Sequence, residues 1–149
     1  MFDFNDRVVI VTGAVGNLGL ATAKAFQRAG ARTALVDRSP DRLKRAYAEV
    51  ANPHDHFLAG DGGFGAYSAS KSAVLRLSES LADELKPAGI NVNCVLPGTI
   101  DTPQNRQERP SADHGKWVEP AAIADVILFL ASDAARAVNG AAVPVFGKA

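Results

Sequence analysis

The fold is decided by residues 7–19, which read Arg7-Val8-Val9-Ile10-Val11-Thr12-Gly13-Ala14-Val15-Gly16-Asn17-Leu18-Gly19. Val8 to Val11 form a continuous apolar, β-branched run, which is typical of a strand buried on both faces. Three glycines at a spacing of three follow, and an apolar-periodic segment then opens a helix. This order predicts an anion site, because free N–H groups at the helix start meet a space that side chains leave open. The alternative is a tight strand-to-helix turn that holds no ligand.

Composition restricts the class of protein. The chain has 149 residues, and we expect a single domain over 1–149. The formal net charge is zero and no lysine or arginine run occurs, so neither nucleic acid nor an anionic membrane is an expected partner. The single cysteine, Cys94, excludes an internal disulfide and favours the cytoplasm. We see no signal peptide and no apolar helix long enough to span a bilayer, so we expect a soluble, cytoplasmic protein.

Predicted strands and helices alternate along the chain. The strands are expected at 8–11, 32–36, 56–59, 90–96 and 141–146, and the helices at 20–29, 41–50, 66–86 and from 120 onward. Such alternation predicts an α/β protein with a doubly wound, parallel, five-stranded sheet. Pro144 cannot donate to a ladder, which places the last strand at a sheet edge. The polar segment 99–116 has two prolines and no periodicity, and we expect a loop there.

The helix predicted over 66–86 carries an apolar stripe. Its members are spaced for one helix face and comprise Ala73, Leu77, Leu81 and Leu85, widened by Ala66, Ser70 and Val74.

Asp37 ends the second predicted strand, about twenty residues after the glycine turn. A carboxylate there accepts hydrogen bonds from adenosine ribose hydroxyls and repels a 2′-phosphate, which favours NAD over NADP. Arg38 beside it weakens that preference. The alternative is a turn or cap carboxylate, although Ser39 could cap the next helix without it.

Tyr67 and Lys71 lie four residues apart, so the predicted helix 66–86 places them on one face. A nearby ammonium stabilises tyrosinate and lowers the phenol pKa, which allows the tyrosine to exchange a proton with a substrate hydroxyl or carbonyl. Hydride transfer to nicotinamide is the coupled step. Taken alone, a tyrosine and a lysine at this spacing usually form a solvated helix face.

Taken together and in order, these motifs resemble those of the short-chain dehydrogenase/reductase family, which are Rossmann-fold oxidoreductases that use NAD or NADP. Residues 12–19 resemble the family's threonine–glycine cofactor signature, with Asn17 where the middle glycine usually stands; asparagine tolerates a left-handed backbone. The resemblance implies hydride transfer between nicotinamide and an alcohol or carbonyl substrate. It implies that the catalytic residues are Tyr67 and Lys71, and that the cofactor-binding residues are Gly13, Gly16, Asn17, Leu18, Gly19, Asp37, Asp61, Lys71, Gly98, Ile100 and Thr102.

Several of these residues have specific roles in the family. The resemblance implies that Asp61 meets the adenine amino group and that Lys71 also holds the nicotinamide ribose. It places Ile100 and Thr102 on the carboxamide. No metal is expected, because His54 and His56 have no further ligand cluster nearby.

Two family features are missing. Members carry an Asn-Ala-Gly motif after a fourth strand and a catalytic serine shortly before the tyrosine. In this chain Asp61 precedes Tyr67 almost directly, no serine lies between Ser39 and Ser68, and no Asn-Ala-Gly occurs. About two strand–helix units are therefore absent at the Gly62-Gly63 joint. An engineered deletion accounts for this best, ahead of a natural internal deletion or splice product and of a fragment of a damaged gene.

The missing units bear on topology and assembly. The resemblance implies a parental strand order of 3-2-1-4-5-6-7, and removing strands four and five leaves 3-2-1-4-5, with strand 90–96 closing up against strand 8–11. Alternatively the helix 66–86 keeps its place and a second chain fills the gap by strand swapping. Outward apolar residues such as Leu75 would favour a homodimer through that helix.

Three functional hypotheses remain open. The first is a shortened domain that binds NAD but has lost most turnover, because one missing transition-state donor costs about 10²–10³ in rate. The second is a working NAD-dependent oxidoreductase completed by rearrangement or by a partner chain. The third is a non-catalytic fold model or interaction module.

Overall fold

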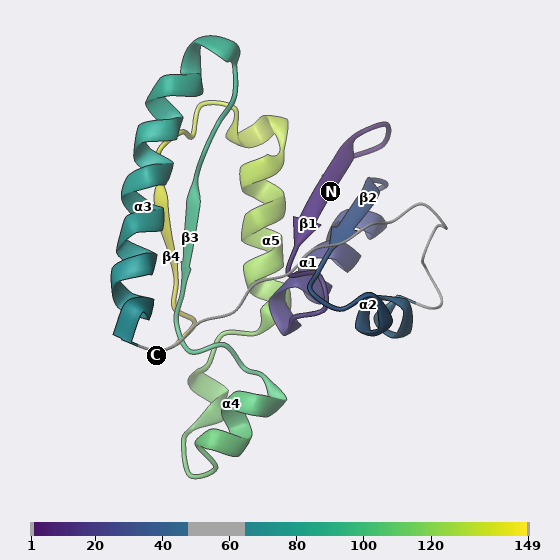
Figure 1. The fold of residues 1–149 in the computed structure, drawn as a ribbon, viewed down its shortest axis with the longest axis vertical. Helices are drawn as coiled ribbons and strands as arrows, with labels where there is room; N and C mark the ends of the chain where they lie inside the picture. Colours follow the sequence, from purple (N-terminus) through teal and green to yellow (C-terminus); the bar gives the residue numbers. More distant parts are fainter. Residues whose placement is uncertain (1, 48–64, 149) are drawn as a thin grey trace.

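The computed structural model describes residues 2–47 and 65–148, and it is an α/β structure with parallel strands (Figure 1). The predicted fold class is confirmed, whereas the predicted strand 56–59 lies outside the described residues. In chain order the regular elements are β1 (Val8–Thr12), α1 (Asn17–Arg28), β2 (Arg32–Val36), α2 (Pro40–Ala46), α3 (Gly65–Leu85), β3 (Cys94–Pro97), α4 (Pro103–Glu108), α5 (Pro120–Ala131) and β4 (Ala142–Val145). Short 3₁₀ turns occur at Lys86–Ala88, His114–Lys116 and Asp133–Ala135. None of the described helices is long and apolar enough to cross a bilayer.

The N-terminal half contains β1, α1, β2 and α2. The two strands are parallel, in a register that runs from Val8 opposite Arg32 to Thr12 opposite Val36. Helix α1 covers one face of the pair, because the alternate residues Val9 and Val11 point toward it and the glycine turn lets the chain reverse. The core of this half consists of Val11, Ala14, Ala23, Leu35, Leu43 and Tyr47.

The C-terminal half contains α3, β3, α5 and β4. Strands β3 and β4 are parallel, with Cys94 opposite Ala142 and Leu96 opposite Pro144. Among the described residues β4 pairs with β3 alone, in agreement with the edge position predicted from Pro144. Figure 1 shows α3 alongside this strand pair and α5 between it and the N-terminal half.

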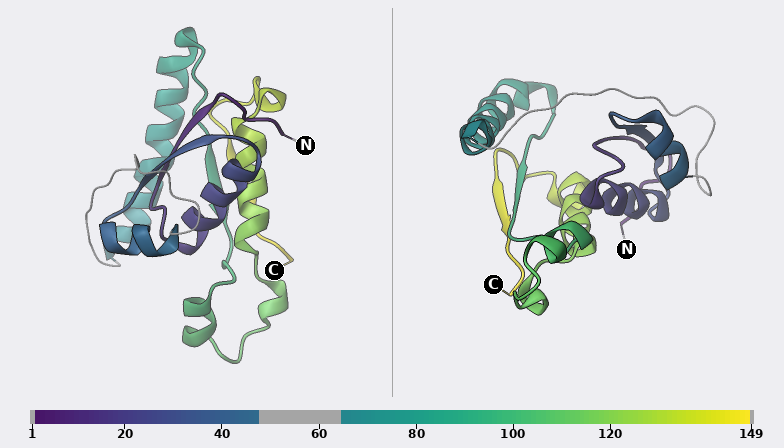
Figure 2. Two further views of the ribbon diagram at one scale, coloured as in Figure 1. Left: turned by 90° about the vertical axis from the view of Figure 1, so that its right-hand side faces the viewer. Right: turned by 60° about the horizontal axis from the view of Figure 1, so that its bottom comes forward.

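The two halves meet through α1 and α5, which pack side by side (Figure 2, right). Their interface is apolar and is built by Phe4, Ala25, Phe26, Ala124 and Leu128. The rings of Phe4 and Phe26 meet edge to face with centroids 4.9 Å apart. An exposed ion pair between Arg7 and Asp133, at 3.1 Å, adds little at the periphery.

The prediction that strand 90–96 closes up against strand 8–11 is wrong. Among the described residues the strands form two separate two-stranded sheets, β1 with β2 and β3 with β4. The α1–α5 contact provides the physical reason, because closing the sheet would require the chain to give up this packed apolar interface. The edge of β1 away from β2 is unpaired among the described residues. On one face of β1, the side chains Val8 and Ile10 are 61% and 69% exposed.

Part of the apolar stripe on α3 is exposed. Val74 and Leu77 are 51% and 58% exposed. Ser78 and Ala82 contact the strand pair and the segment before β4. The Ser78 Oγ lies 3.1 Å from the Cys94 Sγ, and the Ala82 carbonyl accepts a hydrogen bond from the Asn139 side-chain amide at 2.8 Å. Leu75, which was expected to point outward, is half-buried. Leu81 and Leu85, in the same stripe, are half-buried, so burial changes along the helix.

Candidate functional site

The glycine turn ends β1 and starts α1. Gly13 has a left-handed backbone (φ 66°), and its carbonyl accepts the Gly16 N–H at 3.0 Å. The first helical hydrogen bond of α1 runs from the Leu20 N–H to the Gly16 carbonyl at 2.8 Å. The three N–H groups before Leu20 therefore have no helical acceptor and are available to an anion.

Asn17 does not need the left-handed conformation that its substitution for glycine suggested. It is the first residue of α1, and Asp6 is the non-glycine residue with positive φ among those described. The position therefore accepts asparagine because its backbone is helical.

The packing of the turn explains why Gly19 is a glycine. A Cβ built on Gly19 would lie 2.8 Å from the Gly13 carbonyl carbon, closer still to its oxygen, and 3.0 Å from the Ala14 Cα. Side chains cannot occupy that space, so the start of α1 lies directly against the end of β1. A Cβ built on Gly16 would lie 3.2 Å from the Gly13 carbonyl oxygen, so a side chain is less strongly excluded there.

Opposite the turn lies α4, within the segment 99–116 that was expected to be a loop. Thr102 caps this helix by accepting the Asn105 N–H at 3.1 Å, and Pro103 occupies its first turn. The Asn105 side-chain amide donates to the Ile100 carbonyl at 2.7 Å. A threonine followed by proline is a helix-start signal, and it is the feature of the sequence that could have predicted α4.

Asp101, just before α4, and Arg106, within it, form a bidentate ion pair with N–O distances of 2.5 and 2.7 Å. The hydrogen bond to Arg106 holds the pKa of Asp101 below its usual value, and the same pair raises the pKa of Arg106.

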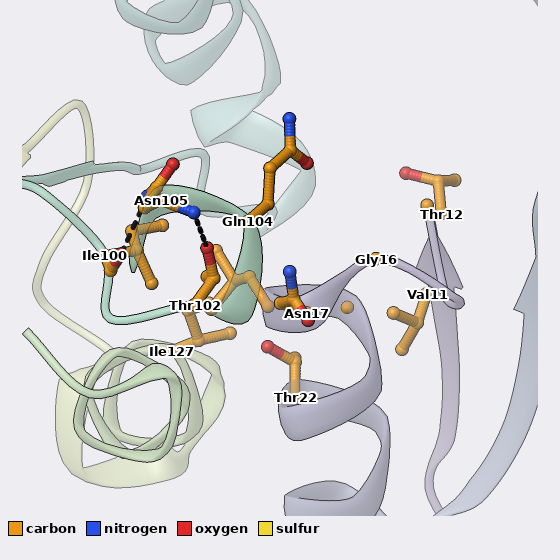
Figure 3. Close-up of a pocket in the computed structure, with 13 residues that line it drawn as sticks. Val11, Thr12, Gly16, Asn17, Thr22, Ile100, Thr102, Gln104, Asn105 and Ile127 are labelled. Carbon is orange, nitrogen blue, oxygen red and sulfur yellow. Dashed lines mark hydrogen bonds between the residues drawn. The ribbon is translucent and has the colours of Figure 1, made fainter. Parts of the chain in front are cut away.

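The glycine turn and α4 enclose a pocket of about 550 Å³ between the two halves of the molecule (Figure 3). It is lined by Val11, Thr12, Gly13, Gly16, Asn17, Leu18, Gly19, Thr22, Ile100, Thr102, Gln104, Asn105 and Ile127. Among these, seven were predicted as cofactor-binding from the sequence: Gly13, Gly16, Asn17, Leu18, Gly19, Ile100 and Thr102. Residues some eighty positions apart in the chain thus meet at one pocket.

Thr22 is a pocket residue that the sequence reasoning missed. Its side chain is 7% exposed, and its hydroxyl has no hydrogen-bond partner among the described residues. Helical spacing was the available signal, because Thr22 lies one turn beyond Leu18 on α1. Gln104 and Asn105 were missed because α4 itself was not expected.

Asp37 lies beside the turn but does not line this pocket. Its carboxylate is 7% exposed and accepts two backbone N–H groups, from Val15 at 3.0 Å and from Arg38 at 2.7 Å. The helix α2 is capped by Ser39, as the alternative interpretation of this segment allowed. The carboxylate thus holds the turn whether or not it also meets a ribose.

The remaining predicted residues are not gathered at the pocket. Gly98 lies where β3 passes β4, and a Cβ there would meet Phe146 at 3.1 Å. Lys71 is on an exposed position of α3, and no described residue of α3 lines the pocket. Tyr67 is in the first turn of α3, and its side chain lies outside what the structure describes, as do Asp61, His54 and His56. In the described parts no group of three metal-ligating side chains occurs.

Comparison with known proteins gives two sequence-profile matches. Residues 7–62 match the short chain dehydrogenase profile, and residues 57–147, well over half of the chain, match the profile described as enoyl-(acyl carrier protein) reductase. A cyclohexanol dehydrogenase from Rhodococcus sp. (strain TK6) is 36% identical over 107 residues, which cover 66% of this chain and 40% of that enzyme. The chain spans less than half the length of this relative.

Solved structures share the fold. A short-chain dehydrogenase/reductase from Brucella melitensis superimposes with a TM-score of 0.85 at 21% identity, covering 98% of this chain and 97% of that one. A short-chain oxidoreductase from Pseudomonas aeruginosa PAO1, solved with NADPH bound, gives a TM-score of 0.81 at 20% identity, covering 99% and 98%. The N-terminal and C-terminal halves of the molecule are therefore placed relative to each other as in the fold of these proteins.

Proposed function

The chain belongs to the short-chain dehydrogenase/reductase family, and from this premise we propose that its pocket binds a nicotinamide adenine dinucleotide while hydride transfer is absent or very slow. One observation carries the proposal: the N–H groups at the start of α1 meet Ile100 and Thr102 across a pocket of about 550 Å³.

The residues present fit such a cofactor. Gly13 and Gly16 line the pocket without side chains, so a pyrophosphate could approach the backbone of the turn closely. The buried hydroxyl of Thr22 is a polar group in the pocket that lacks a partner among the described residues. We propose that the residues holding the cofactor are Gly13, Gly16, Asn17, Leu18, Gly19, Ile100 and Thr102.

We propose NAD rather than NADP as the cofactor. The carboxylate of Asp37 stands at the end of β2, next to the turn, where its charge would repel a 2′-phosphate. Both of its oxygens already accept one backbone N–H, and each retains a lone pair for a ribose hydroxyl.

The proposed loss of turnover rests on missing donors. Bound nicotinamide would supply hydride exchange with an alcohol or carbonyl carbon. In this chain Tyr67 would exchange the proton and Lys71 would hold the ribose and favour the tyrosinate. No serine precedes Tyr67 after Ser39, so the substrate oxygen lacks a donor whose removal costs about 10²–10³ in rate.

Titration of NADH fluorescence tests the binding proposal. We expect enhancement with the unmodified chain, weaker binding of NADPH, and loss of affinity in Gly19→Ala and Asp37→Ala. Equal fluorescence for all three proteins would contradict the proposal and support a domain that binds no dinucleotide.

A steady-state assay tests the catalytic part. Simple alcohols with NAD should give no turnover above the Tyr67→Phe background. Turnover that disappears in Tyr67→Phe would instead support a working oxidoreductase.

A further inference from the structure

One peptide group of the glycine turn is held from both sides. The Tyr47 hydroxyl donates to the Ala14 carbonyl at 2.6 Å, and the Val15 N–H donates to the Asp37 Oδ2 at 3.0 Å. The Ala14 C=O and the Val15 N–H belong to the same peptide bond and point in opposite directions across its plane. Two hydrogen bonds on opposite sides prevent that plane from rotating.

Burial makes both contacts strong. Tyr47 is 1% exposed and Ala14 is fully buried, so the carbonyl has no water to replace a lost donor. Burial, and then the negative charge of Asp37, raise the pKa of Tyr47 to about 12, so the phenol remains a neutral donor at neutral pH. Asp37 is itself oriented by the Arg38 N–H, which its Oδ1 accepts at 2.7 Å.

The position of this peptide connects it to the pocket. It lies between Gly13 and Gly16, which both line the pocket, and Gly16 is the residue from which α1 starts. A rotation of the Ala14–Val15 peptide would move Gly16 and with it the unpaired N–H groups of the first turn. Tyr47 itself does not line the pocket, so any effect on a ligand passes through the turn.

We propose that Tyr47 is a positioning residue for dinucleotide binding: together with Asp37 it fixes the Ala14–Val15 peptide and thereby aims the N–H groups at the start of α1. The inference rests on the proposed function, because it assigns a role toward the ligand of the same pocket. Tyr47 directly follows α2, which ends at Ala46.

The test compares Tyr47→Phe, which removes only the hydroxyl, with Leu43→Ala, a truncation in the same core cluster that leaves the peptide contacts in place. We expect the NADH dissociation constant to rise about tenfold in Tyr47→Phe, the effect of one buried hydrogen bond, and to change less than about twofold in Leu43→Ala. The Val15 amide resonance in a ¹H–¹⁵N spectrum without ligand should shift in Tyr47→Phe and stay in place in Leu43→Ala.

The outcomes separate the two proposals. Failure of the unmodified chain to bind NADH overturns the proposed function. Normal NADH binding by the unmodified chain, with equal affinity in Tyr47→Phe or an equal loss in Leu43→Ala, overturns the positioning role alone.

A second measurement keeps the hydroxyl in place if Tyr47→Phe does not fold. The chain has two tyrosines, so 3-fluorotyrosine labelling gives two ¹⁹F resonances, which a labelled Tyr67→Phe chain assigns. The Tyr47 resonance should move when NADH is added. An unmoved resonance at saturating NADH overturns the inference.

Discussion

Gly19 and Gly13 lie in direct backbone contact: a Cβ on Gly19 would stand 2.8 Å from the Gly13 carbonyl carbon. Gly19→Ala must therefore push α1 away from the end of β1. We expect at least a tenfold loss of NADH affinity and a lower melting temperature, measured by fluorescence titration and thermal unfolding. Gly16→Ala, where the contact would be 3.2 Å, should have a smaller effect on both. The reverse order of the two variants would contradict this account of the turn.

The buried phenol of Tyr47 predicts a loss of stability at alkaline pH. Its pKa is about 12 in the folded chain against an ordinary 10.0, so between these values the unfolded state releases a proton that the folded state retains. The contribution is complete below pH 10 and is lost as pH rises toward 12, amounting to on the order of 2 kcal/mol. Denaturant unfolding at several pH values measures it, and Tyr47→Phe should show a flatter decline above pH 10.

The unpartnered hydroxyl of Thr22 predicts that Thr22→Val stabilises the ligand-free chain. Valine keeps the shape and removes a buried polar group, so we expect the free energy of unfolding to rise by about 1 kcal/mol. Thr33 offers a matched control, because its hydroxyl accepts the Gln27 amide at 3.0 Å and Thr33→Val loses that bond. A gain in Thr33→Val as large as in Thr22→Val would mean that the unpaired hydroxyl is not the cause.

The ion pair between Asp101 and Arg106 predicts a measurable titration change. With Arg106 in place the pKa of Asp101 is lowered, so the carboxylate stays ionised as pH falls into the range where free aspartates take up protons. The pair therefore supports α4 above that range, and the support is lost as pH falls through the lowered pKa. Arg106→Gln should return the Asp101 pKa toward its ordinary value in an NMR titration. Arg109→Gln, a substitution of a nearby exposed arginine, is the control and should leave the pKa of Asp101 unchanged.

The sequence predicted the pocket better than the sheet. The glycine turn is a local device, fixed by residues adjacent in the chain, and the strand-end position of Ile100 and Thr102 follows from parallel topology. Whether β3 would pair with β1 depended on a different quantity, the strength of the contact between α1 and α5. That contact is made by side chains about a hundred residues apart, such as Phe26 and Leu128, and no local pattern reports it.

Two further features also depend on tertiary contacts. Burial along α3 depends on its tertiary neighbours, because Val74 and Leu77 are exposed although they belong to the apolar stripe. The hydrogen bond from Tyr47 to the Ala14 carbonyl joins residues far apart in the chain, and no local pattern in the sequence reports it. The Tyr47 hydroxyl acquires a partner only when α2 folds back toward the turn.

The two halves meet through a pair of helices, and among the described residues no strand pairing joins them. This arrangement determines how the molecule would come apart. Each half has its own hydrogen-bonded strand pair, so neither needs the other to satisfy its backbone. Separation of α1 from α5 would therefore widen the pocket while both halves stay folded. A ligand that contacts both walls of the pocket would hold the two halves together.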